Sequence, residues 1–263
     1  MKFREKILRF LMRRPEVPPV SIALEQVMRA GDFVILQIGA HVGNTYNDPL
    51  FHGIALHADE LRRRVPPVHQ IVLVEPVEAA FEQLRRNYSS IPGVRFENAA
   101  IAETSGPRSF YRLGVDPEKW GYPEFLSQLG SLKRERMGAL WDNLENIRDY
   151  KQFYLKHLVI DTVPCLTFRE LIERCALPRI DLLQMDTEGS EYDILASIPF
   201  DELDIRFINY ERVLLDGKKR DCERLLRGWG YKLAHYGQDT FCYKKEDRYL
   251  AKYWRGSHET RVD

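Results

Sequence analysis

The sequence predicts an α/β fold in which helices cover both faces of a mostly parallel β-sheet. Apolar, strand-like runs alternate with segments of helical spacing through most of the 263 residues, and this alternation is typical of parallel sheets. The clearest unit is 180–195, where an apolar run ends at Asp186 and a helical pattern begins beyond Ser190. No internal repeat or change of composition divides the chain, so we expect one domain with an insertion.

The N-terminal segment has a basic, amphipathic helical pattern over residues 1–14, which prolines 15, 18 and 19 end. Such a helix can dock on its own domain or on a partner in a homo-oligomer, or it can lie on an anionic membrane. It lacks the apolar core and cleavage site of a signal peptide. A short second helix should begin with Ser21 as its N-cap and end at Gly31.

The first half of the chain contains three expected strands, at 33–38, 70–75 and 94–96. A glycine turn, Gly39-Ala-His-Val-Gly43, follows the first strand, and a helix should occupy 44–64 with a break near Pro49. Pro76 is expected at the first position of the helix after the second strand. The turn at 105–107 predicts a hairpin whose second arm is 108–112.

The regular alternation lapses over residues 113–157, which are rich in aromatic and charged residues. We expect an insertion with helices near 133–152, either a lid or substrate wall over the ligand end of the sheet or a solvated decoration. Strands should follow at 158–163, 180–185 and 205–211, and an antiparallel pair around Gly237 should complete the sheet. We therefore expect three regions in the chain: cap helices in 1–32, the main domain at 33–245 and a C-terminal tail at 246–263.

Composition narrows the range of functions. Lys+Arg and Asp+Glu both number 39, so the chain lacks the basic excess of nucleic-acid-binding proteins. The four cysteines form no Cys-x-x-Cys pair, which favours reduced thiols in a cytoplasmic protein over a zinc site or a disulfide scaffold. No apolar run approaches the roughly 20 residues that span a bilayer.

Acidic residues stand where three expected strands end, at Glu75, Asp186 and Glu211. Ligands of open α/β sheets bind outside the carboxyl ends of the strands. In nucleotide-binding units the glycine turn after the first strand faces the ligand, and the acid after the second strand binds the ribose hydroxyls. The turn at 39–43 is not GxGxxG, which disfavours NAD and favours an adenosine cofactor without a pyrophosphate.

Several segments are similar, in order, to the FkbM family of S-adenosylmethionine-dependent methyltransferases: FVILQIGAHVGN, VLVEPVEAAFEQLRRN, ENAAIAETSG, GSLKRER, IDLLQMDTEGSEYDIL and INYER. The resemblance implies the Rossmann-like class I methyltransferase fold, with a seven-stranded sheet, helices on both faces and one antiparallel strand. It also implies O-methylation of a sugar, a glycan or a secondary metabolite. The positions that it assigns to the cofactor site are Gln37, Gly39, Ala40, His41, Gly43, Asn44, Glu75, Pro76, Asn98, Ala99 and Asp186.

Gln37 departs from the family, which usually has an acid at this position to support the amino group of the cofactor. A glutamine can still accept a hydrogen bond, but it carries no charge. This departure supports an alternative function, a non-catalytic module that senses the cofactor or binds another protein. Glu75 and the DTEGSE block at 186–191 support an enzyme.

A hydroxyl is a poor nucleophile at neutral pH, so a base should take its proton. Asp186 is the first candidate for this base, and Glu188, Glu211 and His235 are the others. A divalent metal with Asp186 as a ligand is an alternative way to acidify the hydroxyl. Aromatic residues of the insertion can stack on the acceptor or form a small core of their own; they are Trp120, Tyr122 and Trp141.

Overall fold

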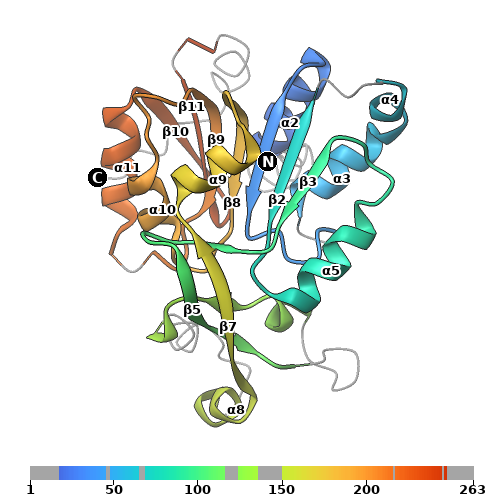
Figure 1. Ribbon diagram of the computed structural model, residues 1–263. Coiled ribbons are helices and arrows are strands. Elements are labelled where there is room, and N and C mark those ends of the chain that lie inside the picture. The colour runs from blue at the N-terminus through green and yellow to red at the C-terminus, as the bar shows by residue number, and fades with distance from the viewer. Residues whose placement is uncertain are drawn as a thin grey trace, which may run out of the picture.

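The computed structural model describes residues 18–45, 48–64, 69–115, 124–135, 150–215, 217–244 and 246–247. Within these ranges a seven-stranded sheet has the order β10-β11-β9-β8-β1-β2-β3 (Figure 1). The strands are β1 (Val34–Ile38), β2 (Gln70–Val74), β3 (Val94–Glu97), β8 (Ile180–Met185), β9 (Ile205–Glu211), β10 (Tyr231–Tyr236) and β11 (Asp239–Lys244). The basic helix expected at 1–14 and the three aromatic residues of the insertion lie outside the described residues.

The sheet is parallel except at one strand. Strands β3, β2, β1, β8 and β9 pair in parallel, whereas β11 is antiparallel to both β9 and β10. The terminal hairpin around Gly237 is therefore confirmed. The antiparallel strand itself lies inside the sheet, and β10 forms the edge.

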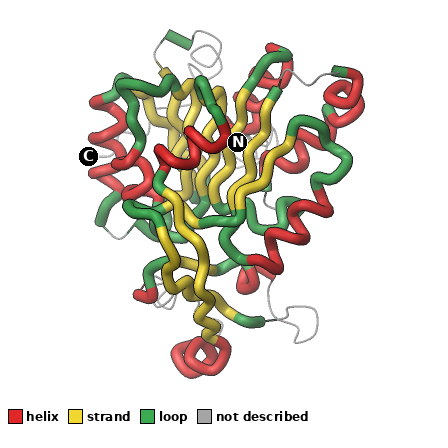
Figure 2. Tube along the Cα trace, in the orientation of Figure 1, coloured by secondary structure: helices red, strands yellow, loops and turns green. Residues whose placement is uncertain are grey.

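Helices cover both faces of this sheet (Figure 2). One face carries α2 (Pro19–Ala30), α3 (Pro49–Leu56), α4 (Ala58–Arg63) and α5 (Glu78–Asn87), whose apolar residues belong to one core cluster. The other face carries α9 (Phe168–Cys175), α10 (Glu191–Ser197) and α11 (Lys219–Gly228), which belong to a second cluster. Successive residues of β1 alternate between the clusters, because side chains of a strand point to opposite faces. A strand buried on both sides must be apolar throughout, as β1 is apart from Gln37.

A second sheet of four strands lies at the carboxyl end of the parallel strands, in the lower part of Figure 1. Its order is β4-β7-β5-β6, with β4 at Ala100–Ile101, β5 at Gly106–Leu113, β6 at Gly130–Ser131 and β7 at Leu158–Leu166. Strands β5 and β7 pair antiparallel over eight residues, and the helix α8 (Tyr150–His157) lies beyond them. A short 3-10 helix, η1 (Glu124–Ser127), precedes β6.

The expected hairpin with its second arm at 108–112 was wrong. Strand β5 does not pair with the strand before it but with β7, about 50 residues later in the chain. Strand β4 joins the same sheet by pairing in parallel with Cys165 and Leu166. An alternating pattern identifies a strand but not its partner, so the local turn at 105–107 was a misleading guide.

Some helix boundaries also differ from the expectation. Helix α2 begins at Pro19, with Pro18 rather than Ser21 at the N-cap, because proline fits the first turn of a helix. Pro76 is not the first helical residue, since α5 begins at Glu78 after Val77. The helix expected at 44–64 begins only at Pro49, where Asp48 caps it, and its break lies at His57 rather than near Pro49.

The four cysteines are buried and unpaired. Within the described ranges, the helices are too short or too polar to cross a membrane.

Candidate active site

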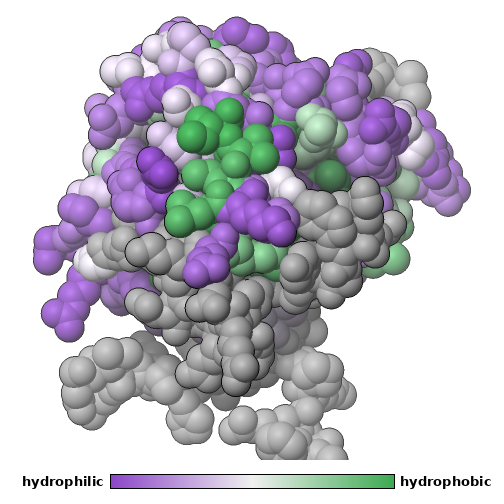
Figure 3. All heavy atoms as spheres, turned by 90° about the horizontal axis from the view of Figure 1, so that it is seen from below, coloured by the Kyte–Doolittle hydropathy of each residue, from purple (hydrophilic) through white to green (hydrophobic). Residues whose placement is uncertain are grey.

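A cavity of about 1120 Å³ lies where the carboxyl ends of the parallel strands meet the second sheet. Sites for small molecules commonly measure roughly 300–1,000 Å³, so this cavity has room for a cofactor together with an acceptor. The loops after β1, β2, β8 and β9 line it on one side, and residues of β5, η1 and β6 line it on the other. Seen from this end of the molecule, hydrophobic side chains gather in a patch, with hydrophilic side chains along its upper border (Figure 3).

The turn after β1 brings the backbone of the chain to the cavity. Gly39 adopts φ +82°, and an added Cβ there would lie 1.8 Å from the carbonyl oxygen of Asp186. Only glycine tolerates this conformation and this approach. His41, in the same turn, adopts φ +46°, a value that is uncommon outside glycine. The turn therefore presents bare backbone and small side chains, including the buried Ala40, to a ligand.

Glu75 follows β2 and holds the glycine turn in place. One of its carboxyl oxygens accepts a hydrogen bond of 2.8 Å from the backbone N–H of His41, and the other accepts one of 2.8 Å from Val77. Burial raises the pKa of Glu75 to about 7, although both backbone hydrogen bonds act in the opposite direction. A carboxylate offers about four acceptor positions, so each oxygen can still accept a hydrogen bond from a ligand in the cavity.

Gln37 and Asp48 form a buried pair on the cavity wall. The side-chain amide of Gln37 donates to the Asp48 carboxyl group, with 2.9 Å between Nε2 and Oδ2. Gln37 Oε1 is buried and has no hydrogen-bond partner. Burial raises the pKa of Asp48, while hydrogen bonds from Gln37 and from the first turn of α3 lower it.

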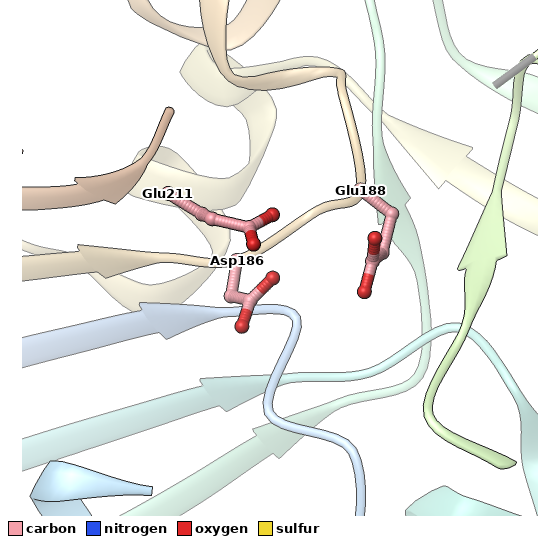
Figure 4. Close-up of side chains that lie close together, drawn as sticks. All are labelled: Asp186, Glu188 and Glu211. Carbon is pink, nitrogen blue, oxygen red and sulfur yellow. The ribbon is translucent and has the colours of Figure 1, made fainter. Parts of the chain in front are cut away.

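Three carboxyl groups come together at the ends of β8 and β9. Asp186 follows β8, Glu211 is the last residue of β9, and Glu188 lies in the loop after β8. All three side chains turn toward one space (Figure 4). One carboxyl oxygen of each lies within 4.8 Å of those of the other two. Such a set can share a proton or hold a divalent cation through oxygen ligands.

Partial removal from water and charge repulsion raise the pKa of all three groups. Asp186 is exposed toward the cavity, and the pKa of its carboxyl group is raised first by the protein atoms around it and then by the charges of Glu191 and Asp239. The pKa of Glu188 rises through burial and the charge of Asp186, and that of Glu211 rises for the same two reasons. Carboxylates this close cannot all ionise at moderate cost, so the cluster retains a proton at pH values where an exposed acid would have lost it.

The loop that carries Glu188 is held by residues on both sides. Glu191 is 1% exposed, and its carboxyl group accepts hydrogen bonds from the backbone of Thr187 and Gly189 at 2.7 and 3.0 Å. Glu188 adopts φ +54°, and Ser131 of β6 donates a 3.0 Å hydrogen bond to its carbonyl oxygen. Glu191 therefore supports the loop, and the second sheet positions Glu188.

Most of the residues expected at the site do line the cavity. These are Gln37, Gly39, Ala40, His41, Glu75, Pro76, Ala99, Asp186, Glu188 and Glu211. Three others support its walls. Gly43 packs against Tyr88 and Leu84, Asn44 accepts a hydrogen bond from Asn87, and Asn98 donates to the carbonyl oxygen of Glu75 at 3.0 Å.

His235 does not line the cavity, contrary to expectation. Its ring contacts Thr240 of β11, with 3.1 Å between Nδ1 and Oγ1, and lies 3.5 Å from Glu223 of α11. The next residue, Tyr236, lines the cavity instead. The physical reason is the alternation of side chains along a strand, which sends neighbouring residues to opposite sides of β10.

Two acids of the cavity wall were missed in the sequence. Asp48 precedes Pro49 and looks like an ordinary N-cap, and nothing in its neighbourhood suggests that it meets Gln37. Asp239 follows the turn of the last hairpin and lines the cavity, where it accepts a 2.9 Å hydrogen bond from Asn209. A polar residue in an apolar strand, as at Gln37 and Asn209, is the signal that could have pointed to both, because a buried amide needs a partner.

Comparison with solved structures finds similar chains, and the three described here are similar at low identity. An O-methyltransferase from Bacillus cereus in complex with SAH is 12% identical, with a TM-score of 0.39 and coverage of 92% of this chain and 90% of that one. A SAM-dependent O-methyltransferase from Thermotoga maritima is 10% identical, with a TM-score of 0.39 and coverage of 89% and 69%. A TehB-like SAM-dependent methyltransferase from Corynebacterium glutamicum is 10% identical, with a TM-score of 0.36 and coverage of 93% and 97%.

No curated protein matches the chain. The family model described as the methyltransferase FkbM domain matches residues 37–233. This range begins at Gln37 on β1, ends in β10, and includes Glu75 and the three clustered carboxylates. With its mostly parallel seven-stranded sheet and its cavity at the carboxyl ends of the strands, the chain belongs to the FkbM family of methyltransferases.

Proposed function

We propose that this protein is an S-adenosylmethionine-dependent O-methyltransferase that acts on a hydroxyl group of a sugar, a glycan or a secondary metabolite. The observation that carries the proposal is the cluster of Asp186, Glu188 and Glu211 on the cavity wall. A general base works best when its pKa lies near the working pH, and burial with repulsion raises the pKa of each of these carboxyl groups.

The residues on the other side of the cavity fit the cofactor. The Glu75 carboxyl group uses one position on each oxygen for the backbone, which leaves acceptors for two neighbouring ribose hydroxyls. The close approach of Gly39 to Asp186 leaves the backbone of the turn uncovered. Ala40 and Ala99 are small and buried at the wall, so they leave space for a flat base and a sulfur-bearing chain.

S-adenosylmethionine, when bound, supplies a methyl group on a positively charged sulfur. The residues of this chain would then orient the acceptor and receive its proton. Asp186 would hold the acceptor hydroxyl beside this methyl group and would accept its proton. The protein atoms around the carboxyl group and the charges of Glu191 and Asp239 keep this carboxylate basic. Holding both reactants in line lowers the entropic part of the barrier.

The same three carboxylates could instead hold a divalent cation that acidifies the hydroxyl. Proton transfer to Asp186 and metal-assisted deprotonation predict different responses to a chelator. A proton acceptor works after treatment with a chelator, whereas a metal-dependent enzyme would lose its activity and regain it with Mg²⁺ or Mn²⁺.

The test is methylation of a panel of hydroxylated acceptors with S-adenosylmethionine that carries a labelled methyl group. We expect label in an ether that survives mild base, with mass spectrometry locating it on oxygen. Label only on amines or on base-labile carboxyl esters would contradict methylation of a hydroxyl group. Binding of S-adenosylhomocysteine without transfer to any acceptor of the panel would favour the non-catalytic module instead.

A further inference from the structure

Gln37 and Asp48 together leave hydrogen-bonding capacity that the chain does not use. Gln37 is 4% exposed and Asp48 is 8% exposed, and both line the cavity. The Gln37 Nε2 donates to Asp48 Oδ2, but Gln37 Oε1 has no partner. Buried acceptors are paired in the great majority of cases, so a donor from a ligand is the simplest partner for this oxygen.

Capping of helix α3 explains only one oxygen of Asp48. Oδ1 accepts hydrogen bonds from the backbone of Leu50 at 2.7 Å and of Phe51 at 2.9 Å. Oδ2 is the oxygen that faces Gln37. A side chain needed only as a cap could be asparagine or serine equally well, so the charge of Asp48 and its buried glutamine partner require another explanation.

The charges around the pair favour a cation. Asp48 and Asp186 raise the electrostatic cost of each other's ionisation, since the charge of Asp48 contributes to the raised pKa of Asp186. The titratable groups that face Asp48 from α3 and α5 are His52 and Tyr88. In the described part of the cavity wall, Arg112 is the only Lys or Arg side chain, and it pairs with Asp161.

We propose that Asp48 and Gln37 bind the α-ammonium group of the cofactor, with Asp48 supplying the negative charge and Gln37 Oε1 accepting an N–H. An ammonium group has three donors and a positive charge, and hydrogen bonds between charged groups are the strong ones. The inference rests on the proposed function, because it takes S-adenosylmethionine as the cofactor. In this arrangement Asp48 supplies the negative charge that an acid at position 37 would otherwise supply.

The first measurement is calorimetric titration of Asp48→Asn and the wild type with two probes. S-adenosylhomocysteine contains the ammonium group, and 5′-methylthioadenosine lacks the whole amino-acid portion. We expect Asp48→Asn to weaken the binding of S-adenosylhomocysteine about 10- to 100-fold, which corresponds to the loss of a charge-assisted hydrogen bond. Affinity for 5′-methylthioadenosine should change by less than about threefold, since that probe does not reach the pair. Asparagine caps helices as well as aspartate does, and thermal unfolding of both proteins checks that α3 remains intact.

The second measurement uses a variant in which the acid and the amide of this hydrogen-bonded pair are exchanged. In the Gln37→Glu/Asp48→Asn double variant, position 48 becomes the donor and position 37 the acceptor, and one negative charge is restored. We expect the affinity for S-adenosylhomocysteine to return to within about fivefold of the wild type. A double variant no better than Asp48→Asn would overturn the assignment of the charge to this pair.

Asp239→Asn is the matched control. Asp239 also lines the cavity and also accepts a 2.9 Å hydrogen bond from a buried amide, that of Asn209. Loss of S-adenosylhomocysteine affinity in Asp48→Asn but not in Asp239→Asn supports a local ammonium site. Equal losses in both variants, or equal losses for both probes, would overturn it. A wild type that binds neither probe would refute the proposed cofactor itself, so the two failures are distinguishable.

Discussion

Gly39 and Asp186 approach each other so closely that an added Cβ on Gly39 would lie 1.8 Å from the carbonyl oxygen of Asp186. This contact joins the turn after β1 to the end of the neighbouring strand β8. It brings the cofactor side of the cavity and the cluster of carboxylates next to each other. The absence of a side chain at Gly39 therefore allows Asp186, the proposed base, to lie directly beside the turn after β1.

Gly39→Ala should lower the free energy of unfolding by about 3 kcal/mol or more, because it combines a clash with backbone atoms and a strained φ. Urea denaturation measures this loss. Gly230→Ala is the matched control, since Gly230 has a similar φ of +85° but nothing within 4 Å of an added Cβ. Its cost should be about 1 kcal/mol. Equal losses for the two variants would show that the contact with Asp186 is unimportant.

Glu75→Gln should reduce the binding free energy of S-adenosylhomocysteine by about 1–3 kcal/mol, the range for a hydrogen bond to a charged group. The reason is the loss of the carboxylate that we expect to bind the ribose hydroxyls. Isothermal titration calorimetry gives the affinity directly. Glu97→Gln is the control, because Glu97 is a buried acid at the end of β3 that pairs with Arg95 and Arg174. Unchanged affinity in Glu75→Gln would remove Glu75 from the cofactor site.

The stability of the ligand-free protein should fall as the pH rises from about 4.5 to about 7. Burial raises the pKa of Glu75 from 4.5 to about 7, so the folded protein holds a proton that the unfolded chain has already released. Unfolding then becomes easier with rising pH, by at most about 3 kcal/mol for this group. Glu75→Gln should be less stable but show a flatter dependence on pH. Urea denaturation across this range would refute the idea if the wild type became more stable.

Asp186→Asn should reduce kcat by about 10²- to 10⁴-fold, the usual contribution of a general base. S-adenosylhomocysteine affinity should change much less, since the amide keeps the size of the side chain. Asp181→Asn at the opposite end of β8 is the control. Asp181 accepts a hydrogen bond from Val34, and an asparagine oxygen can accept the same bond. Normal turnover in Asp186→Asn would exclude Asp186 as the base.

Ser131→Ala should lower kcat roughly 5- to 30-fold while leaving cofactor affinity unchanged, because about 1–2 kcal/mol of support for the Glu188 loop is lost. Ser131 donates to the Glu188 carbonyl oxygen and accepts from the backbone of Lys133 at 3.2 Å. The pH profile of kcat should shift as well, since the carboxyl group of Glu188 belongs to the cluster of three. Ser109→Ala, at an exposed serine of β5, should have no effect. A change in stability without a shift of the pH profile would indicate a purely structural role.

The parts of the site that follow apolar strands could be predicted from the sequence. Glu75, Asp186 and Glu211 each end a run of buried residues, and parallel strands bring such ends to one edge of the sheet. Asp48 could not be predicted in this way, because it reaches the site through the fold of the loop after β1 and not through a strand. For His235, the sequence shows a strand but not which of its two sides faces the cavity.

The second sheet was the main feature of the fold that the sequence did not reveal. Residues 106–113 and 158–166 pair across a separation of about 50 positions, and no local pattern encodes such a partnership. The 158–163 strand was expected, but as part of the main run of strands. By contrast, the α9 capping box of Thr167 and Glu170 is a local motif, and the structure contains both of its hydrogen bonds.

The antiparallel pairing of β5 with β7 has a consequence for how acceptor choice can change within this architecture. Leu113 and Leu158 are paired partners, and the backbone of Gly114 donates to His157 at 2.8 Å. The intervening segment therefore leaves and re-enters the protein at adjacent points. The length of this segment can therefore change without altering the spacing of β5 and β7. Residues 127–130 of this segment line the cavity, and Ser131 holds the Glu188 loop, so a segment exchanged between relatives should keep this part and vary elsewhere.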